Sequence, residues 1–348
     1  MKNPRDTIRS FACFALMASV LHGMRAQDIQ QAQFFALPVT TNPAFAGHME
    51  FDCKEMKSNL RGSWLSRRQW GRAFSSDAAI VELFQKKSRM GYAIQFQNQR
   101  IDGGKFSSAA GGFSLSHRLN FSNDWHLSSG LQISLVQRGF AFSELRFTDQ
   151  FTDRGFTGPA GQQDLPAASK IYPDVSAGIL GFNERFWAGF SVQQITRPSV
   201  SFLQPGERLP MRFNIQAGMK FPLRSDPNFG LFRRDVSLHP VWQWRIRQPF
   251  NQMDAGFYYN HEPLMAGLLY RGSVFGKTGA DNRLTQDAVV FLFGIKKEGL
   301  RLGYSIELNI KRKTTGAFPS QEITLSYQYA RKGCLRRKFG KWIPVPSI

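Results

Sequence analysis

The sequence has little cysteine and, beyond its N-terminus, no long hydrophobic run. Of its three cysteines, Cys13 lies in the N-terminal segment, which leaves Cys53 and Cys334 and excludes a disulfide framework. Free thiols fit two cysteines this far apart better than a disulfide does. A helical membrane protein is excluded because a spanning helix needs about 20 consecutive apolar residues. The mean hydropathy of -0.32 is compatible with a membrane barrel, whose strands are apolar only at every second position.

Motifs of catalysis and metal binding are also absent. The six histidines show no HExxH or Cys-His spacing, and no GxSxG nucleophile elbow occurs. The run Gly272–Thr278 ends like a phosphate-binding loop, but Arg271 stands where the first glycine belongs. The run Phe147–Phe156 offers carboxylates without the spacing of an EF-hand. We interpret both runs as loops and predict no catalytic residue, no cofactor and no metal site.

Acidic residues are few, 25 against 45 lysines and arginines, so the formal net charge is +20. Such a balance raises the question of nucleic-acid binding. The basic residues are scattered through turns and strands, however, and no nucleic-acid motif occurs. Lipid phosphates or acidic partners are therefore the better candidates.

The first 26 residues have the layout of a secretory signal peptide. Lys2, Arg5 and Arg9 precede an apolar core, Phe11–Leu21, that is too short to span a bilayer, and small residues follow up to Ala26. We therefore expect residues 1–26 to be removed on export. Without them the formal charge falls by 3, from +20 to +17.

Alternation of apolar and polar residues marks the rest of the chain. It is clearest in Leu300–Ile310, where every second side chain is apolar, and it returns in Glu322–Tyr329. A period of two places the apolar set on one face of a β-strand and the polar set on the other. A run of about 11 residues is twice the usual strand length and suits a tilted strand that crosses a membrane. The pattern predicts the wall of a membrane β-barrel.

The same pattern, interrupted by turn residues, divides residues 57–330 into about 14 strands. The predicted strands are Lys57–Arg67, Phe74–Phe84, Arg89–Asn98, Ser107–Leu119, Asp124–Arg138, Asp174–Phe182, Arg185–Gln194, Met211–Phe221, Asp235–Arg247, Gln252–Asn260, Pro263–Arg271, Asp287–Lys296, Leu300–Ile310 and Gln321–Tyr329.

The connections between these strands alternate in length. Five of the even-numbered ones, such as Asn183–Glu184, are short, and Pro222–Arg234 is the long exception. The odd-numbered ones are mostly longer, above all Gly139–Pro173, Ile195–Pro210 and Gly272–Gln286. This layout is typical of an outer-membrane barrel with both ends in the periplasm. The alternative is a soluble sandwich, but about 14 strands around an apolar interior would enclose more volume than side chains fill. We therefore predict an all-β fold, a transmembrane antiparallel β-barrel with apolar residues facing lipid and polar residues facing a lumen that is open or plugged.

Residues 27–56 precede the first predicted strand, and their apolar and polar residues do not recur at a regular spacing. Pro38 and Pro43 exclude a regular central strand or a long helix there. Residues that favour a tight turn lie together in the run Asn42, Pro43, Ala44, Phe45, Ala46 and Gly47. We expect an irregular segment that packs on or inside the barrel and is a candidate plug, as is the long loop Gly139–Pro173.

Residues 331–348 form a C-terminal tail with six basic side chains and no acidic one. A solvated tail that touches lipid phosphates and a periplasmic docking arm fit this composition equally well.

One set of segments carries a family likeness, among them Gln33–Phe35, Asn42–Gly47, Phe147–Gln150, Phe186–Val192, Leu209–Phe213, Gly256–Asn260 and Leu300–Ser305. In their order and spacing, these segments resemble the PorP/SprF family of type IX secretion system outer-membrane proteins of Bacteroidetes. The likeness covers about Gln27 to Tyr329, and it rests on the set of segments rather than on any one of them. We predict that the shared positions are structural. They are Asn42, Pro43, Ala44, Phe45, Gly47, Asp149, Gln150, Trp187, Arg197, Pro198, Pro210, Met211, Gly303 and Tyr304.

The resemblance implies a monomeric barrel in the outer membrane, without enzymatic activity, that supports protein secretion and in some cases gliding motility. The implied partners are outer-membrane lipid, periplasmic secretion-motor and lipoprotein subunits, and a secreted surface protein or adhesin. The chain would be either a core component that contacts the periplasmic ring or an accessory barrel that serves one large adhesin. A passive channel for small or hydrophobic solutes is the alternative function.

Overall fold

The computed structural model describes residues 31–49, 58–70, 73–121, 124–141, 151–152, 155–156, 169–200, 208–226, 234–248, 250–272, 288–297, 299–310 and 319–329. They belong to one compact unit that begins at Gln31. Three short 3₁₀ turns occur, η1 (Pro38–Thr40), η2 (Pro43–Phe45) and η3 (Asp102–Gly104). No helix within the described ranges is long and apolar enough to cross a membrane.

All other regular elements in the described ranges are strands. They are β1 (Ser58–Gln69), β2 (Phe74–Gln85), β3 (Met90–Ile101), β4 (Phe106–Asn120), β5 (His126–Phe140), β6 (Phe151–Thr152), β7 (Gly155–Phe156), β8 (Ser169–Phe182), β9 (Phe186–Gln193), β10 (Arg212–Met219), β11 (Phe221–Asp226), β12 (Arg234–Arg247), β13 (Phe250–His261), β14 (Leu264–Gly272), β15 (Ala288–Lys297), β16 (Leu300–Asn309) and β17 (Ser320–Tyr329).

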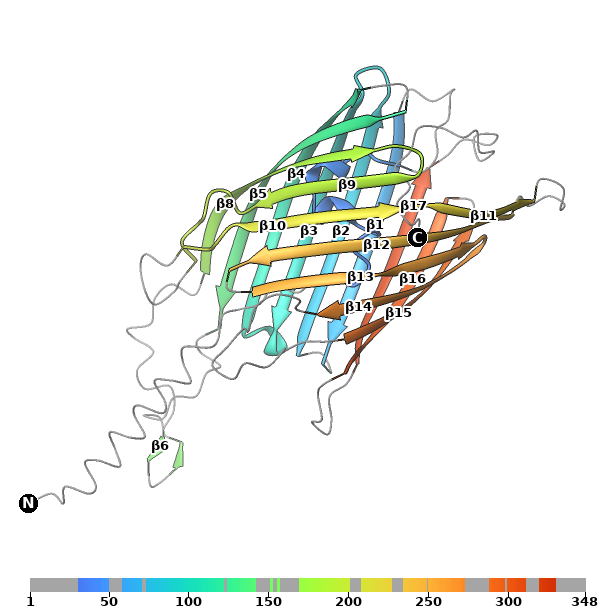
Figure 1. Ribbon diagram of the computed structural model, residues 1–348. Coiled ribbons are helices and arrows are strands. Elements are labelled where there is room, and N and C mark those ends of the chain that lie inside the picture. Colours follow the sequence, from blue (N-terminus) through green and yellow to red (C-terminus); the bar gives the residue numbers. More distant parts are fainter. Residues whose placement is uncertain are drawn as a thin grey trace, which may run out of the picture. The chain divides into compact units, whose positions relative to one another are not determined.

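The strands close into a barrel (Figure 1). Every neighbouring pair is antiparallel, and β17 returns to pair with β1. β10 and β11 follow each other along one edge of β12, with Phe213 opposite Ile246 and Phe221 opposite Leu238. The two therefore occupy one position in the ring, and the 15-stranded sheet is a closed barrel of 14 strand positions. The predicted fold is confirmed.

The predicted strands differ from the observed ones mainly at two places. β8 begins at Ser169 rather than at Asp174, and the strand predicted to end at Phe221 continues as β11 to Asp226. In β8, Pro173 pairs with Leu135 of β5. The ladder between β8 and β9 begins only at Ala177, so Pro173 lies on a free edge, where a strand tolerates the missing N–H.

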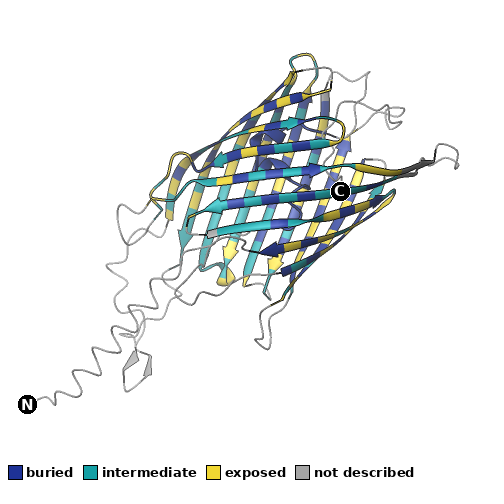
Figure 2. Ribbon diagram, viewed as in Figure 1, coloured by how far each residue is buried: buried dark blue, intermediate teal, exposed yellow. Residues whose placement is uncertain are grey.

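The two faces of the barrel differ as the alternation predicts (Figure 2). In β5, Leu131, Ile133 and Leu135 are 58 to 65% exposed, whereas Gln132 and Ser134 between them are buried. In β5 the outward face is therefore apolar and the inward face polar, which is the arrangement of a barrel surrounded by lipid. Other strands also direct apolar side chains inward, such as Trp187 and Tyr258, and these are buried.

The barrel has two distinct ends. At the short-turn end, residues 86–89, 121–125, 183–185, 262–263 and 298–299 connect the strands, and residues 227–233 are the longer exception. The barrel starts at Ser58 and finishes at Tyr329 on this end. At the long-loop end, residues 141–168, 194–211, 273–287 and 310–319 connect the strands, although the connections after β1, β3 and β12 are short there too.

We predict that Ile94→Arg prevents assembly of the barrel while Gln97→Arg on the same strand is tolerated. Ile94 is 66% exposed on the outward face, and an arginine facing lipid near the midplane costs about 2 to 4 kcal/mol. Gln97 is half-buried on the inward face. The folded fraction is measured as the heat-modifiable band of outer-membrane extracts on gels, and equal losses for both variants would contradict the assignment of faces.

Candidate functional site: a filled lumen

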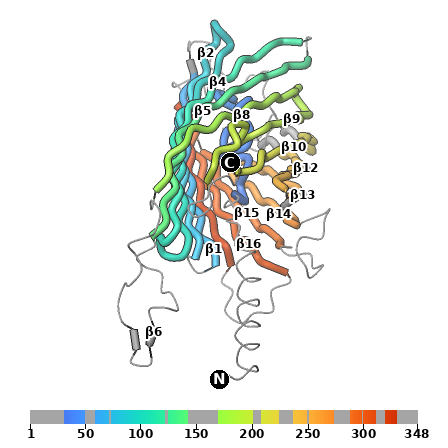
Figure 3. The backbone as a smooth tube through the Cα atoms, turned by 90° about the vertical axis from the view of Figure 1, so that its left-hand side faces the viewer, coloured from blue at the N-terminus to red at the C-terminus, as the bar shows by residue number. Residues whose placement is uncertain are grey.

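Residues 31–49, here called the luminal segment, lie inside the barrel. Figure 3 shows this segment, in dark blue, enclosed by the strands. Its side chains and backbone contact inward-facing residues of strands around the ring. Ala32, Gln33, Val39, Asn42 and Ala44 are 0% exposed. The interior of the described barrel is therefore occupied by its own chain.

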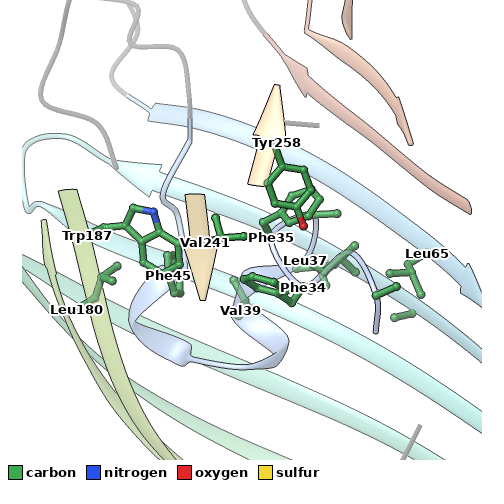
Figure 4. Packing of buried hydrophobic residues seen from close by; sticks show 14 of the residues in the cluster. Phe34, Phe35, Leu37, Val39, Phe45, Leu65, Leu180, Trp187, Val241 and Tyr258 are labelled. Carbon is green, nitrogen blue, oxygen red and sulfur yellow. The ribbon is translucent and has the colours of Figure 1, made fainter. Parts of the chain in front are cut away.

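The luminal segment supplies nine of the 22 residues of an apolar core, and the strands supply the other 13 (Figure 4). The ring centroid of Phe45 lies 5.6 Å from that of Trp187 on β9, edge to face. The ring of Phe35 meets Tyr258 of β13 at 4.4 Å in the same geometry. Val241 of β12 belongs to the same cluster. This core lies between the segment and the wall, so it fixes the segment's position by packing as well as by hydrogen bonds.

Wall hydroxyl groups bind the backbone of the segment, Ser116 and Ser128 near the short-turn ends of β4 and β5, and Ser191 farther along the barrel on β9. Ser116, Ser128 and Ser191 donate to the carbonyl oxygens of Ala46, Ala44 and Thr41 at 2.7, 2.9 and 2.6 Å respectively. These bonds satisfy carbonyl groups that would otherwise be buried without a partner, which would cost about 1 to 3 kcal/mol each.

Asn42 organises the turn of the segment. Its side-chain oxygen accepts the backbone N–H of Ala44 at 2.9 Å and so caps η2. Its amide nitrogen donates to the carbonyl oxygen of Ile179 on β8 at 3.1 Å. One side chain therefore both shapes the turn and attaches it to the wall.

Glycines of the wall make room for this turn. A Cβ atom at Gly91, Gly130 or Gly178 would come closer than 3.0 Å to Ala46, Ala44 or Asn42 respectively. At Gly91 and Gly130 the obstructing atoms belong to the backbone of the segment, which cannot move aside as a flexible side chain can. These wall positions therefore have no room for even one additional carbon atom beside the segment.

His48 lies one residue before Met49, where the described segment ends, near the short-turn end of the barrel. A guanidinium nitrogen of Arg118 donates to its Nδ1 at 2.8 Å, since arginine has no acceptor. Nδ1 of His48 therefore accepts a hydrogen bond and carries no proton.

At the long-loop end, Glu322 of β17 holds the other end of the segment. Its two carboxylate oxygens accept the backbone N–H groups of Ala32 and Gln33 at 2.8 and 2.7 Å. Glu322 is 0% exposed, and Arg67 of β1 balances its charge at 3.1 Å.

The ion pair of Arg67 belongs to a network of buried ion pairs that runs across the inward face of several neighbouring strands. The pairs are Arg67 with Glu307 at 2.8 Å, Glu307 with Arg271 at 2.6 Å, Arg271 with Asp254 at 2.9 Å, and Asp254 with Arg245. With Glu322 the network has three basic and three acidic side chains. Arg271 also donates to the carbonyl oxygen of Gln31 at 2.8 Å. The network thus binds the segment through both its first carbonyl and its first amides.

Among the described residues, no group of three or more His, Cys, Asp or Glu side chains could hold a metal ion. The charged side chains of the network contact one another and the luminal segment. The arrangement binds a polypeptide backbone within a closed wall.

Comparison with known proteins identifies the family. The family model described as type IX secretion system membrane protein PorP/SprF matches residues 23–327. The chain belongs to the PorP/SprF family. It is therefore a non-enzymatic β-barrel of the outer membrane that works with secretion-machinery partners. A search of curated proteins finds no match.

Solved outer-membrane barrels are similar in fold. CdiB from Acinetobacter baumannii has a TM-score of 0.42 and 7% identity, with 79% of this chain and 60% of that chain covered. BamA from Haemophilus ducreyi, lacking POTRA domains 1–3, has a TM-score of 0.41 and 8% identity, with 90% and 82% covered. A mutant Rh. blastica porin has a TM-score of 0.34 and 8% identity, with 78% and 99% covered. These are likenesses of fold alone.

The structure brings only some of the PorP/SprF motif positions together. Asn42, Pro43, Ala44, Phe45 and Gly47 lie in the turn of the luminal segment. Trp187 packs against that turn from β9. That these positions are shared because of this packing stays a prediction.

The other motif positions lie elsewhere. Arg197, Pro198, Pro210 and Met211 belong to the connection between β9 and β10 at the long-loop end, where Pro198 accepts the N–H of Leu209 at 2.9 Å. On β16, Gly303 faces the lumen and Tyr304 faces outward. Asp149 and Gln150 fall outside the described residues, as do Cys53, Cys334, the Gly276–Thr278 part of the phosphate-loop-like run and the basic tail.

Sequence reasoning missed the wall residues that hold the segment. Glu307 and Glu322 occupy polar positions of strands whose alternation was recognised, and charged residues at lumen-facing positions are a signal of a buried network. Gly91, Gly130 and Gly178 carry a second signal, because glycine at the inward position of a long strand often marks close approach of another backbone.

We predict that Gly130→Ala destabilises the barrel by about 1 to 3 kcal/mol because its new methyl group would overlap the backbone of the luminal segment. The control is Gly111→Ala, where a Cβ meets nothing within 4 Å. Thermal unfolding of both purified variants in detergent measures the effect. An equal stability of Gly130→Ala and Gly111→Ala would show that the segment does not occupy this position.

Proposed function

We propose that this PorP/SprF protein is a scaffold of the type IX secretion machinery rather than a conduit for its substrates. The filled lumen supports this proposal most directly. The luminal segment is bound to the wall at both ends of the barrel, through Glu322 and Arg271 at one end and Ser116 and Ser128 at the other. A polypeptide in transit would have to replace all of these contacts.

The two ends of the scaffold would serve different partners. Short turns face the periplasm in outer-membrane barrels, so the short-turn end is the surface for periplasmic motor and lipoprotein subunits. The longer connection 227–233 and the tail 331–348 belong to that side of the chain by sequence order. The long-loop end faces outward and would hold a secreted surface protein or adhesin, in gliding cells as part of the gliding machinery.

A passive channel for small or hydrophobic solutes is the rival function. It requires a continuous open lumen, and the buried core of the luminal segment with Trp187 and Tyr258 opposes one.

Affinity purification tests the scaffold. The C-terminally tagged chain is isolated from detergent-solubilised outer membranes and the co-purifying proteins are identified by mass spectrometry, with another tagged outer-membrane barrel from the same cells as the control. We expect specific recovery of periplasmic motor-ring proteins if the chain is a core component, or of one large surface protein if it is an accessory barrel. Recovery of the barrel alone, under conditions that keep envelope complexes intact, would favour the channel.

A further inference from the structure

A groove crosses the outward face of β4, β5, β8 and β9. Its volume is about 620 Å³. Two neighbouring rows of outward-facing residues line it, and each row runs in register over the four strands. The row nearer the short-turn end is His117, Ser129, Ile179 and Phe190, and the next row is Leu115, Leu131, Ala177 and Val192.

Two small residues between large ones produce the groove. Ser129 lies opposite Ile179, and Leu131 lies opposite Ala177, so the two small side chains are diagonal neighbours. Leu131 and Ile179 are 60% and 52% exposed, and Phe190 continues the raised margin on β9. Each of the two middle strands thus offers one small and one large side chain, which leaves a hollow with apolar margins.

The floor of the groove is closed toward the lumen. Gly130 and Gly178 belong to its lining on the two middle strands. On the inner side, an added Cβ at Gly130 would meet the backbone of Ala44, and one at Gly178 would meet the side chain of Asn42. The luminal segment therefore backs this part of the wall, and a ligand in the groove stays on the lipid-facing side.

The groove lies nearer the short-turn end of the barrel. Trp125 and Phe186, whose ring centroids are 6.3 Å apart in edge-to-face geometry, mark the membrane interface at that end, as aromatic girdles do in such barrels. Ser129 follows Trp125 by four residues, which is about 13 Å along a tilted strand toward the bilayer midplane. Because short turns face the periplasm, the groove faces the periplasmic leaflet.

A polar pair interrupts the apolar outward face at the groove. His117 and Ser129 lie directly opposite each other, and both are exposed. The neighbouring outward positions hold Phe113, Leu119 and Leu127, which are exposed apolar residues. A polar group that faces lipid is costly unless it has a hydrogen-bond partner. An imidazole N–H and a hydroxyl group can each donate to an ester or phosphate oxygen of a lipid.

The size of the groove favours a lipid chain over a protein partner. Two rows about 7 Å apart, over three strand spacings of about 4.8 Å, cover only about 100 Å². A stable protein interface buries about 800 Å² on each partner. The groove is also continuous with the lipid-facing surface of β5, where Ile133 and Leu135 are 65% and 58% exposed. Lipid therefore reaches it without displacing any part of the chain that lines it.

We propose that the groove binds one acyl chain of a phospholipid from the periplasmic leaflet, and that His117 and Ser129 bind the polar part of the same molecule. Ala177 gives the chain room, and Leu131 and Phe190 contact its sides. The site is independent of the scaffold role, because it requires only an outer-membrane barrel surrounded by lipid.

Native mass spectrometry of the purified full-length barrel in detergent tests the site. The probe is palmitoyl-oleoyl-phosphatidylethanolamine, titrated after the bulk lipid has been removed. We expect the wild type to bind one lipid more tightly than any further ones. Ala177→Phe should weaken this first binding by at least about tenfold, because the phenyl ring displaces about two methylene groups of the chain.

Ala79→Phe is the matched control. Ala79 is an exposed residue on the outward face of β2, opposite Trp64, and it does not line the groove. Heat modifiability verifies that each variant is folded. Absence of a tighter first lipid on the wild type, unchanged binding in Ala177→Phe, or an equal loss in Ala79→Phe would overturn the proposal. Barrel dimers that Ala177→Phe abolishes would also overturn it, because they would assign the groove to a second copy of the chain.

A second lipid tests the polar pair. Palmitoyl-oleoyl-glycerol has the same chains but no phosphate, so the wild type should bind it more weakly than the phospholipid. His117→Leu should bind both lipids with nearly equal affinity, since leucine suits the outward face but cannot donate a hydrogen bond. A preference for the phospholipid that is unchanged in His117→Leu would overturn the role of His117.

Discussion

The burial of a polypeptide backbone inside a closed wall is the constraint on which the rest of this structure depends. A barrel of 14 strands encloses more space than its own inward side chains can fill, since about eight strands already give a packed centre. The luminal segment fills that space, but it carries amide and carbonyl groups into an interior where each unsatisfied group is costly. Wall residues therefore have to meet them one by one, as Ser128 and Glu322 do.

The charged network at the long-loop end follows from the same constraint. Glu322 is used as an acceptor for two backbone amides, which requires a buried carboxylate, and a buried carboxylate requires a cation such as Arg67. The charge of Arg67 in turn is shared with Glu307, and the chain of pairs continues to Asp254. Networks of this kind contribute little net stability over apolar packing, but removing one member is costly, about 3 to 5 kcal/mol. We interpret the network as fixing where the segment lies rather than as a source of overall stability.

The strands could be predicted from the sequence because their signal is local. Alternation over Leu300–Ile310 determines the two faces of β16, and turn residues mark its ends. Errors arose where a local signal was ambiguous, as at Pro173, which resembles the end of a loop but lies within β8 on a free edge. The irregular course of residues 31–49 was also predictable from Pro38 and Pro43. The contacts of this segment could not be predicted from the sequence. Gln33 and Glu322 are separated by 289 residues, and a periodic pattern within one segment does not show which distant residues it contacts.

Because the chain's own N-terminal segment occupies the lumen, we propose that the protein works through its two ends and not through its interior. Single-channel conductance in planar bilayers tests this most directly, with an open porin reconstituted in the same lipid as the reference. We expect the full-length mature barrel to insert and to pass little or no steady current, because the core of Phe45, Trp187 and Tyr258 occupies the lumen. A stable unitary conductance comparable to that of the open porin would contradict it and would make the passive channel the better description.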